Sequence, residues 1–414
     1  MEAETAVGPG PQHRIIDRRW AGSAAVSAGI ATRRFAVADG TTHYWRNSHI
    51  LSAYKCEGLN LGAAGIIISL ATLDTALGTK QFTEDIAGAA EWLASRPPFT
   101  QAHGFFTGNA GVSVALALAG QRLGRADLVS AARRRFEQAA GNSNPDFDLF
   151  SGAAGIVWAG CLLDAVLGTS WARDLAEQQV SKVRVSARMV DGVVGWDPHP
   201  DFDSSGRIYL GAAHGTAGTA MALSAWGEST GCTVTANLAD EAFCSVIAHG
   251  LTPDGSNILA TTAGNKKPAH HWCHGIAGFL WCLLQASPGR QLTDSHVRET
   301  AVAAFDQGTP LLDNPTMCHG LAGVMETWRM LESVPDFRGR ARHQVCRLVD
   351  TLRMLHHTQG SASVWSSESP SVVTPDLWVG FLGPAVQLAL ANADSDQAVL
   401  SPTWLQRCAI PLDI

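Results

Sequence analysis

The chain has 414 residues, of which 46% are hydrophobic and only 16% charged, so it contains ample material for a large buried core. Its formal net charge of −7 argues against a nucleic-acid groove as the main surface, because phosphate binding requires clustered lysine and arginine. Nine cysteines are an odd count in a chain far larger than disulfide-stapled scaffolds, which predicts reduced thiols and a cytoplasmic location.

The first 45 residues show little periodicity. We expect them to be an N-terminal extension, partly disordered or forming an edge element or lid over Arg33–Trp45, ahead of a single domain over residues 46–414. Met1 to His13 contains neither a basic nor an apolar region of a signal peptide. Two uncharged stretches, Ile208–Gly227 and His270–Gly289, are interrupted by Gly, Ser, Thr and His, which is typical of buried helices rather than membrane spans.

Seven Gly-x-x-Gly motifs divide the remainder of the chain. The spacings between their first glycines are 46, 44, 63, 60, 45 and 60 residues, and these glycines are Gly62, Gly108, Gly152, Gly215, Gly275, Gly320 and Gly380. Each motif leads into a low-charge run that is apolar all round, as in a helix buried on every side. Charged, amphipathic segments with the period of surface helices lie between them, over 83–94, 126–140, 170–189, 235–249, 293–306 and 339–356.

The alternation predicts repeated pairs of one buried and one solvated helix. An open solenoid or a closed ring would satisfy this pattern, but a solenoid should have polar capping repeats at its ends. The first and last repeats are as apolar as the others, which favours the ring. We therefore predict an all-α fold, an α/α toroid of seven helix-pair repeats in which the glycines let the turns crowd together.

Three long connections break the regularity of the repeats. They precede the fourth, fifth and seventh motifs, at Val190–Tyr209, Asp254–His271 and Ser361–Leu377. Loops of this length in a compact helical fold are usually functional or disordered. All three lie on the side of the glycine turns, where we expect them to form the walls of a substrate cleft.

Two of the motifs begin with a cysteine and a histidine, Cys273-His274-Gly275 and Cys318-His319-Gly320. Thiolate and imidazole are ligands that zinc prefers. Cys273, Cys318 and His319 would form an open, catalytic three-ligand site, whereas adding His274 would give a closed, structural one. The remaining alternative has no metal and leaves four reactive residues on a crowded turn with no evident partner.

Two further polar residues occupy related places in other repeats. His214 directly precedes Gly215, as His274 and His319 precede their glycines, and Asp148 stands four residues before Gly152. Equivalent positions in a ring face the same end, so these side chains should converge with the cysteines. The structural alternatives are a core histidine bonded to a carbonyl for His214 and a helix N-cap for Asp148.

Two thiolates and a neutral imidazole formally cancel the charge of Zn²⁺. A water on so electron-rich a metal is less acidic than on a tris-imidazole site, so hydrolysis is not the obvious use. A substrate thiol bound there would have a pKa below its usual value of about 8.5 and would remain nucleophilic. The pattern favours attack by a substrate thiol on an electrophile.

These motifs resemble those of the lanthionine synthetase C-like proteins, the cyclases of lanthipeptide biosynthesis. The resemblance covers residues from about Arg46 to the C-terminus and rests on the seven glycine motifs and the Cys/His residues within them. It implies an α/α toroid with one Zn²⁺ per chain, held by Cys273, Cys318 and His319. The activity implied is intramolecular addition of peptide cysteine thiols to dehydroalanine or dehydrobutyrine, forming lanthionine or methyllanthionine rings.

On this resemblance, His214 is the leading candidate to protonate the α-carbon or stabilise the enolate. Asp148 would assist in deprotonation or orient a neighbouring group, and His274 is a further catalytic candidate. Many bacterial cyclases carry Tyr where His274 stands, and Arg where Ala269 stands; Lys266, Lys267, His270 or His271 would have to replace that cation. The implied partners are a dehydrated precursor peptide and a separate dehydratase or modification enzyme, with membrane association only through such a complex.

Three other functions compete with this one. A terpene cyclase or glycoside hydrolase on a toroid would need aspartate-rich motifs or paired carboxylates, whereas these turns carry Cys and His. A relative that adds glutathione to dehydroamino acids in damaged proteins fits His274. A non-catalytic, peptide-binding scaffold of a modification complex fits Ala269 better than it fits the retained zinc ligands.

Overall fold

The computed structural model describes residues 16–47, 49, 56–142, 145–199, 201, 203–262, 270–286, 295–308, 314–360 and 362–411. Seven helices of this described part form an inner layer, and each begins at or just after the first glycine of a Gly-x-x-Gly motif. They are α2 (Ala63–Leu77), α4 (Asn109–Leu123), α6 (Ala153–Leu167), α8 (Thr216–Thr230), α10 (Ile276–Ala286), α12 (Leu321–Leu331) and α14 (Leu382–Asn392).

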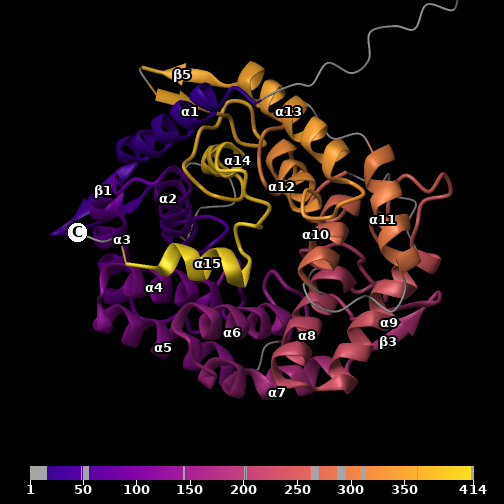
Figure 1. The fold of residues 1–414 in the computed structure, drawn as a ribbon. Coiled ribbons are helices and arrows are strands. Elements are labelled where there is room, and N and C mark those ends of the chain that lie inside the picture. Colours follow the sequence, from indigo (N-terminus) through magenta and orange to yellow (C-terminus); the bar gives the residue numbers. More distant parts are fainter. Residues whose placement is uncertain are drawn as a thin grey trace, which may run out of the picture.

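Seven more helices cover the inner layer from outside, each packed on one or two inner helices (Figure 1). Their buried faces are single stripes, as the amphipathic pattern of the sequence predicted for six of them. They are α3 (Thr83–Ser95), α5 (Ala126–Ala140), α7 (Trp171–Val185), α9 (Thr233–His249), α11 (Ser295–Gln307), α13 (Arg338–Leu355) and α1 (Arg18–Ala31).

The inner layer is a closed ring. Each inner helix contacts the next along the chain from α2 to α14, and α14 contacts α2 again (Figure 1). An open solenoid has no contact between its first and last repeats, so the prediction of an α/α toroid is confirmed. Within the described residues no helix combines the length and the hydropathy needed to cross a lipid bilayer.

Helix α1 supplies the outer helix of the seventh pair, which the sequence analysis did not predict. It packs on α14, and Arg18 donates to the carbonyl oxygen of Asn392 at 2.8 Å. Its buried face consists of small residues, among them Ala21, Ala24, Ala25 and Ala28, so it lacks the large apolar side chains by which the other outer helices are recognised. The predicted extension over residues 1–45 therefore contains a helix of the outer layer; residues 1–15 lie outside the described part.

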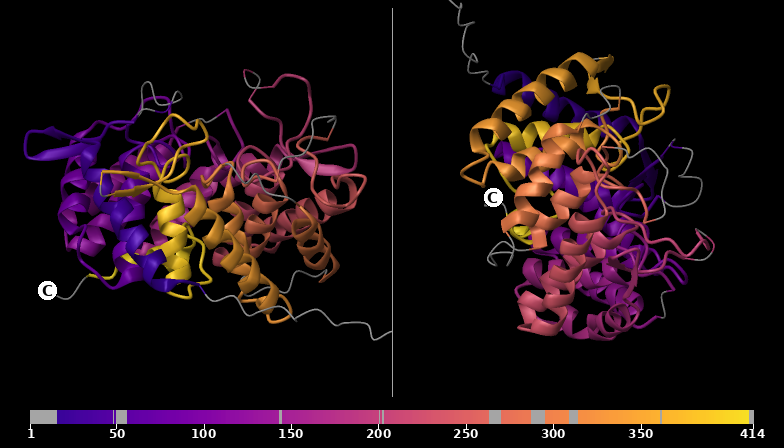
Figure 2. Two further views of the ribbon diagram at one scale, coloured as in Figure 1. Left: turned by 90° about the horizontal axis from the view of Figure 1, so that it is seen from above. Right: turned by 90° about the vertical axis from the view of Figure 1, so that its right-hand side faces the viewer.

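Three antiparallel hairpins interrupt the helical pattern: β1 (Ala36–Asp39) with β2 (Thr42–Trp45), β3 (Arg188–Val190) with β4 (Val193–Gly195), and β5 (His357–Gln359) with β6 (Ala362–Val364). The first lies where an edge element or lid was expected. The other two lie at the start of long connections that were expected to be loops. Figure 2 shows that hairpins and long loops gather at one face of the ring.

The opposite end of the ring is covered by α15 (Pro402–Ala409), which contacts α2, α4 and α6. Its Trp404 indole donates to Thr72 at 3.2 Å, and Arg122, in the last turn of α4, donates to the carbonyl oxygen of Cys408 at 2.8 Å. Because these partners lie in the later parts of α2 and α4, α15 closes the end away from the glycine turns. The face that carries the turns stays accessible.

The glycine motif has a steric cause. A Cβ on Gly278, the second glycine of the fifth motif, would lie 1.6 Å from the carbonyl oxygen of Trp272. A Cβ on Gly111, in the second motif, would lie 1.8 Å from the carbonyl oxygen of Phe105. Only glycine lets each inner helix rest directly on the backbone of its own turn.

Candidate metal centre and cavity

A belt of backbone hydrogen bonds joins the seven turns. Its members are the residues two positions before the first glycine of each motif, and each of the first six donates its N–H to the carbonyl oxygen of the next. The links run from Asn60 to Phe106 (2.9 Å), Phe106 to Phe150 (2.9 Å), Phe150 to Ala213 (3.1 Å), Ala213 to Cys273 (3.0 Å), Cys273 to Cys318 (3.4 Å) and Cys318 to Trp378 (2.9 Å). Equivalent positions of the repeats therefore meet around one centre, as the ring predicted.

A cavity of about 400 Å³ lies within this belt. Its wall is built mainly from belt residues and from the residues that follow them, one position before each glycine. It is lined by Gly58, Asn60, Leu61, Phe106, Thr107, Phe150, Ala213, His214, Cys273, His274, Cys318, His319, Glu368 and Val379. Apolar rings and the Cys/His cluster thus share one pocket, the usual form of a small-molecule or peptide side-chain site.

The three predicted zinc ligands come together in the wall of this cavity. The ligand atoms of Cys273, Cys318 and His319 all lie within 4.8 Å of one another, and His274 is not a member of that group. Cys318 Sγ lies 3.8 Å from His319 Nε2. Tetrahedral zinc with ordinary bond lengths separates a sulfur and a nitrogen ligand by about 3.6 Å, so the donor set fits Zn²⁺ closely.

The electrostatics of the cysteine pair also suit a cation. A hydrogen bond from the Cys318 thiol, helped by His271 and His319, holds the pKa of Cys273 well below its ordinary value. The same hydrogen bond, with burial, raises the pKa of Cys318. Two buried thiols and adjacent imidazoles therefore hold one thiolate readily and share the remaining proton, which a metal ion would displace.

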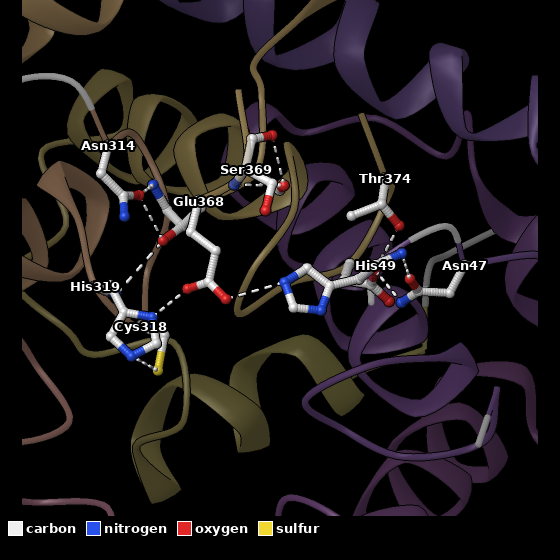
Figure 3. A network of polar contacts seen from close by, with 11 residues as sticks. Asn47, His49, Asn314, Cys318, His319, Glu368, Ser369 and Thr374 are labelled. Carbon is white, nitrogen blue, oxygen red and sulfur yellow. Dashed lines mark hydrogen bonds and ion pairs between the residues drawn. The ribbon is translucent and has the colours of Figure 1, made fainter. Parts of the chain in front are cut away.

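His319 is oriented by Glu368, a residue that the sequence analysis did not single out. The Nδ1 atom of His319 bonds Glu368 Oε2, and the other carboxylate oxygen of Glu368 lies 2.9 Å from Nε2 of His49 (Figure 3). Burial lowers the pKa of His319, but hydrogen bonds to Cys273 and Glu368 raise it to about 10. The only sequence signal for Glu368 was its place in the long connection before the seventh motif.

His214 and Asp148 form a second pair beside the cysteines. Nδ1 of His214 lies 2.7 Å from Asp148 Oδ2. Although burial opposes it, this contact raises the pKa of His214 above its ordinary value, so the imidazolium form is favoured. The ring of His214 also lies against Phe150, with 4.9 Å between ring centroids.

Asp148 acts at the same time as a cap for its own turn. Its Oδ1 accepts from the backbone N–H of Ser151 at 2.7 Å and of Gly152 at 2.9 Å. The sequence analysis treated the cap and the role beside a catalytic group as alternatives. In the structure one carboxylate does both, with one oxygen for each.

His274 points to another part of the cavity. Its ring stacks near His214 at 5.9 Å and lies 5.9 Å from Tyr209. Burial lowers its pKa, and its Nδ1 has no hydrogen-bond partner among the described residues. A neutral imidazole here can bond a substrate group that enters the cavity.

The proposed replacements for the missing arginine are only partly described. Lys266, Lys267 and Ala269 lie outside the described residues. His270 is buried against Phe305, and burial lowers its pKa to about 4, so it carries no charge at neutral pH. His271 lies beside the cluster, with its ring 5.3 Å from that of His319.

The comparisons with known proteins agree with the helical toroid fold. The fold resembles that of nisin cyclase, with a TM-score of 0.65 and 16% identity over 95% of this chain and 97% of that one. More distant is an α-1,6-mannanase from Salegentibacter sp. HEL1_6, with a TM-score of 0.49 and 10% identity over 90% of this chain and 98% of that one. An unsaturated glucuronyl hydrolase from Streptococcus agalactiae has a TM-score of 0.49 and 12% identity over 82% of this chain and 94% of that one. The sequence model of the lanthionine synthetase C-like proteins matches residues 57–336, more than half of the chain. The chain therefore belongs to the lanthionine synthetase C-like family.

Proposed function

We propose that the chain is a zinc-dependent cyclase that adds cysteine thiols of a dehydrated peptide to dehydroalanine or dehydrobutyrine. The observation that carries the proposal is the meeting of Cys273, Cys318 and His319 in the wall of an accessible cavity. Family membership supports a cyclase-like activity in general, and the donor set supports the metal.

Zinc held by two thiolates and one imidazole would lower the pKa of a substrate thiol while leaving its sulfur nucleophilic. Three protein ligands leave the fourth position of a tetrahedral site for that sulfur. His274 is not among the ligands, so the open site is favoured over a closed structural one.

Residues of the protein would supply the proton that completes the addition. Attack of sulfur on the β-carbon of a dehydro residue leaves an enolate whose α-carbon must be protonated. His214 lines the cavity and has a raised pKa, so it can carry that proton at neutral pH. Asp148 would hold the imidazole of His214 in place and stabilise its charged form, and neutral His274 would bond the substrate carbonyl.

The cavity supports a peptide side chain as the reacting group. Phe106, Phe150 and Val379 supply apolar walls that exclude water from a thiol and an alkene. The substrate of this reaction is a peptide that already carries dehydro residues, so a separate dehydratase is the proposed partner. A cytoplasmic location suits the nine cysteines, all within the described residues and all free thiols.

The test is the zinc content of the purified protein and of its Cys273→Ala and Cys318→Ala variants, by elemental analysis. We expect one zinc per chain in the parent and none in either variant, together with thioether formation on a dehydrated peptide by the parent alone. Absence of zinc from protein prepared without chelator would overturn the mechanism. A parent that binds zinc but modifies only added glutathione would assign the chain to the glutathione-adding alternative.

A further inference from the structure

Glu368 lies between two imidazoles at the edge of the cavity. Its Oε2 meets Nδ1 of His319, and its Oε1 lies 2.9 Å from Nε2 of His49 (Figure 3). An ionised carboxylate only accepts hydrogen bonds, so both of these nitrogens carry hydrogen.

The hydrogen on Nδ1 fixes the tautomer of His319. In the neutral imidazole that a metal ion requires, Nε2 then carries the lone pair, and this is the atom that lies 3.8 Å from Cys318 Sγ. The contact with Glu368 also fixes the rotation of the imidazole ring, which His319 needs because its side chain is 33% exposed. Glu368 thus presents the correct nitrogen to the cysteine pair.

His49 fixes Glu368 in turn. The side chain of His49 is only 1% exposed, and its backbone N–H donates to Asn47 Oδ1 at 2.6 Å. The side-chain amide of Asn47 bonds the buried Asp376, which also accepts from Thr374 at 2.6 Å. The backbone of His49 is therefore anchored through Asn47 to Asp376, and its imidazole is buried where it meets Glu368.

We propose that Glu368 and His49 are positioning residues of the metal centre: Glu368 sets the tautomer and orientation of His319, and His49 holds the carboxylate in place. This inference rests on the proposed zinc site. A carboxylate behind a metal-bound imidazole makes the imidazole a stronger donor, and loss of such a partner typically weakens metal binding roughly 10- to 100-fold. In this chain the carboxylate of Glu368 would also add negative charge next to a donor set that must keep a substrate sulfur reactive.

The test measures zinc affinity by competition with a chromogenic chelator, and the absorption spectrum of the Co²⁺-substituted protein. The variants are Glu368→Gln, Glu368→Ala and His49→Asn. Glu332→Gln is the matched control, because Glu332 is a similarly shielded carboxylate, 19% exposed against 22% for Glu368, that pairs with Arg342 far from the cysteines. Urea unfolding of each apo-protein monitors the fold independently.

We expect Glu368→Ala to bind zinc roughly 10- to 100-fold more weakly and to change the cobalt spectrum. Glu368→Gln should lose less zinc affinity, since an amide oxygen still accepts from Nδ1 of His319. His49→Asn should lose less affinity again, and Glu332→Gln should bind zinc as tightly as the parent. A parent that binds one zinc, with all three variants as tight and spectrally unchanged, would overturn the positioning role and leave the proposed function intact. A parent that binds no zinc would overturn the proposed function itself.

Discussion

The double contact of Asp148 allows its two roles to be separated by mutation. In Asp148→Asn, one amide oxygen can still accept from the N–H groups of Ser151 and Gly152, as Oδ1 does now. The oxygen that faces His214 at 2.7 Å is replaced by a donor, so the charged pairing is lost. Asp148→Ala removes both contacts.

The expected magnitudes differ for activity and for stability. A hydrogen bond to a charged group contributes about 1.5–3 kcal/mol. If that energy stabilises the protonated His214 that donates to the α-carbon, its loss slows cyclisation roughly 10- to 150-fold in both variants. Asn is as good a cap as Asp, whereas a cap lost to Ala costs about 0.5–2 kcal/mol, so only Asp148→Ala should be clearly destabilised.

The pH dependence gives the sharper assay. Asp148 raises the pKa of His214. The ion pair therefore stabilises the folded protein fully at pH values below the ordinary pKa of histidine, and this stabilisation is lost as pH rises through the folded-state pKa of His214. Cyclisation by Asp148→Asn should therefore approach that of the parent at mildly acidic pH and fall behind at neutral pH. Rates on a dehydrated peptide and urea midpoints by tryptophan fluorescence measure both effects. An equal deficit at every pH, or equal destabilisation by Asn and Ala, would refute the reasoning.

Three further outcomes are expected. Gly278→Ala should cost about 3 kcal/mol or more in urea unfolding, because its Cβ would meet the carbonyl oxygen of Trp272, whereas Gly339→Ala, with open space around it, should be neutral or slightly stabilising. Burial raises the pKa of Asp376 to about 7, so the free energy of unfolding should fall as pH rises from about 4 to 7. Above that range Asp376→Asn should be more stable than the parent by up to ~4 kcal/mol, as measured by urea midpoints. Equal pH profiles of the two proteins would contradict this. His274→Ala should keep one zinc per chain by elemental analysis, since His274 lies outside the ligand cluster, and loss of the metal would restore the closed four-ligand site.

The fold was predictable because the same steric requirement recurs in each of the seven repeats. A second glycine that must touch a carbonyl oxygen leaves a clear sequence signature, and the amphipathic segments between motifs have large apolar side chains. Helix α1 escaped prediction because it packs through alanines such as Ala24 and Ala28, which carry little periodic signal. The short hairpins escaped because turn contacts, rather than composition, stabilise strands of three or four residues.

The candidate site divides in the same way. Cys273 and Cys318 share one repeat position and His214 and His319 share the next, so ring symmetry predicted that they converge. Glu368 comes from an irregular connection whose path no repeat dictates. Its contact with His319 depends on how that connection folds over the cavity, and this information is not present in local sequence patterns.

The contact between α1 and α14 has a consequence for the order of events during synthesis. The two helices lie far apart in the sequence, so the outer layer can close only after α14 has been synthesised. Cys273, Cys318 and His319 emerge earlier, on an arc of repeats that is still open. Glu368 and α14 follow, and only then can the N-terminal segment with His49 settle against them. The thiols of Cys273 and Cys318 are thus synthesised before Glu368, so the proposed metal site is complete only late in folding.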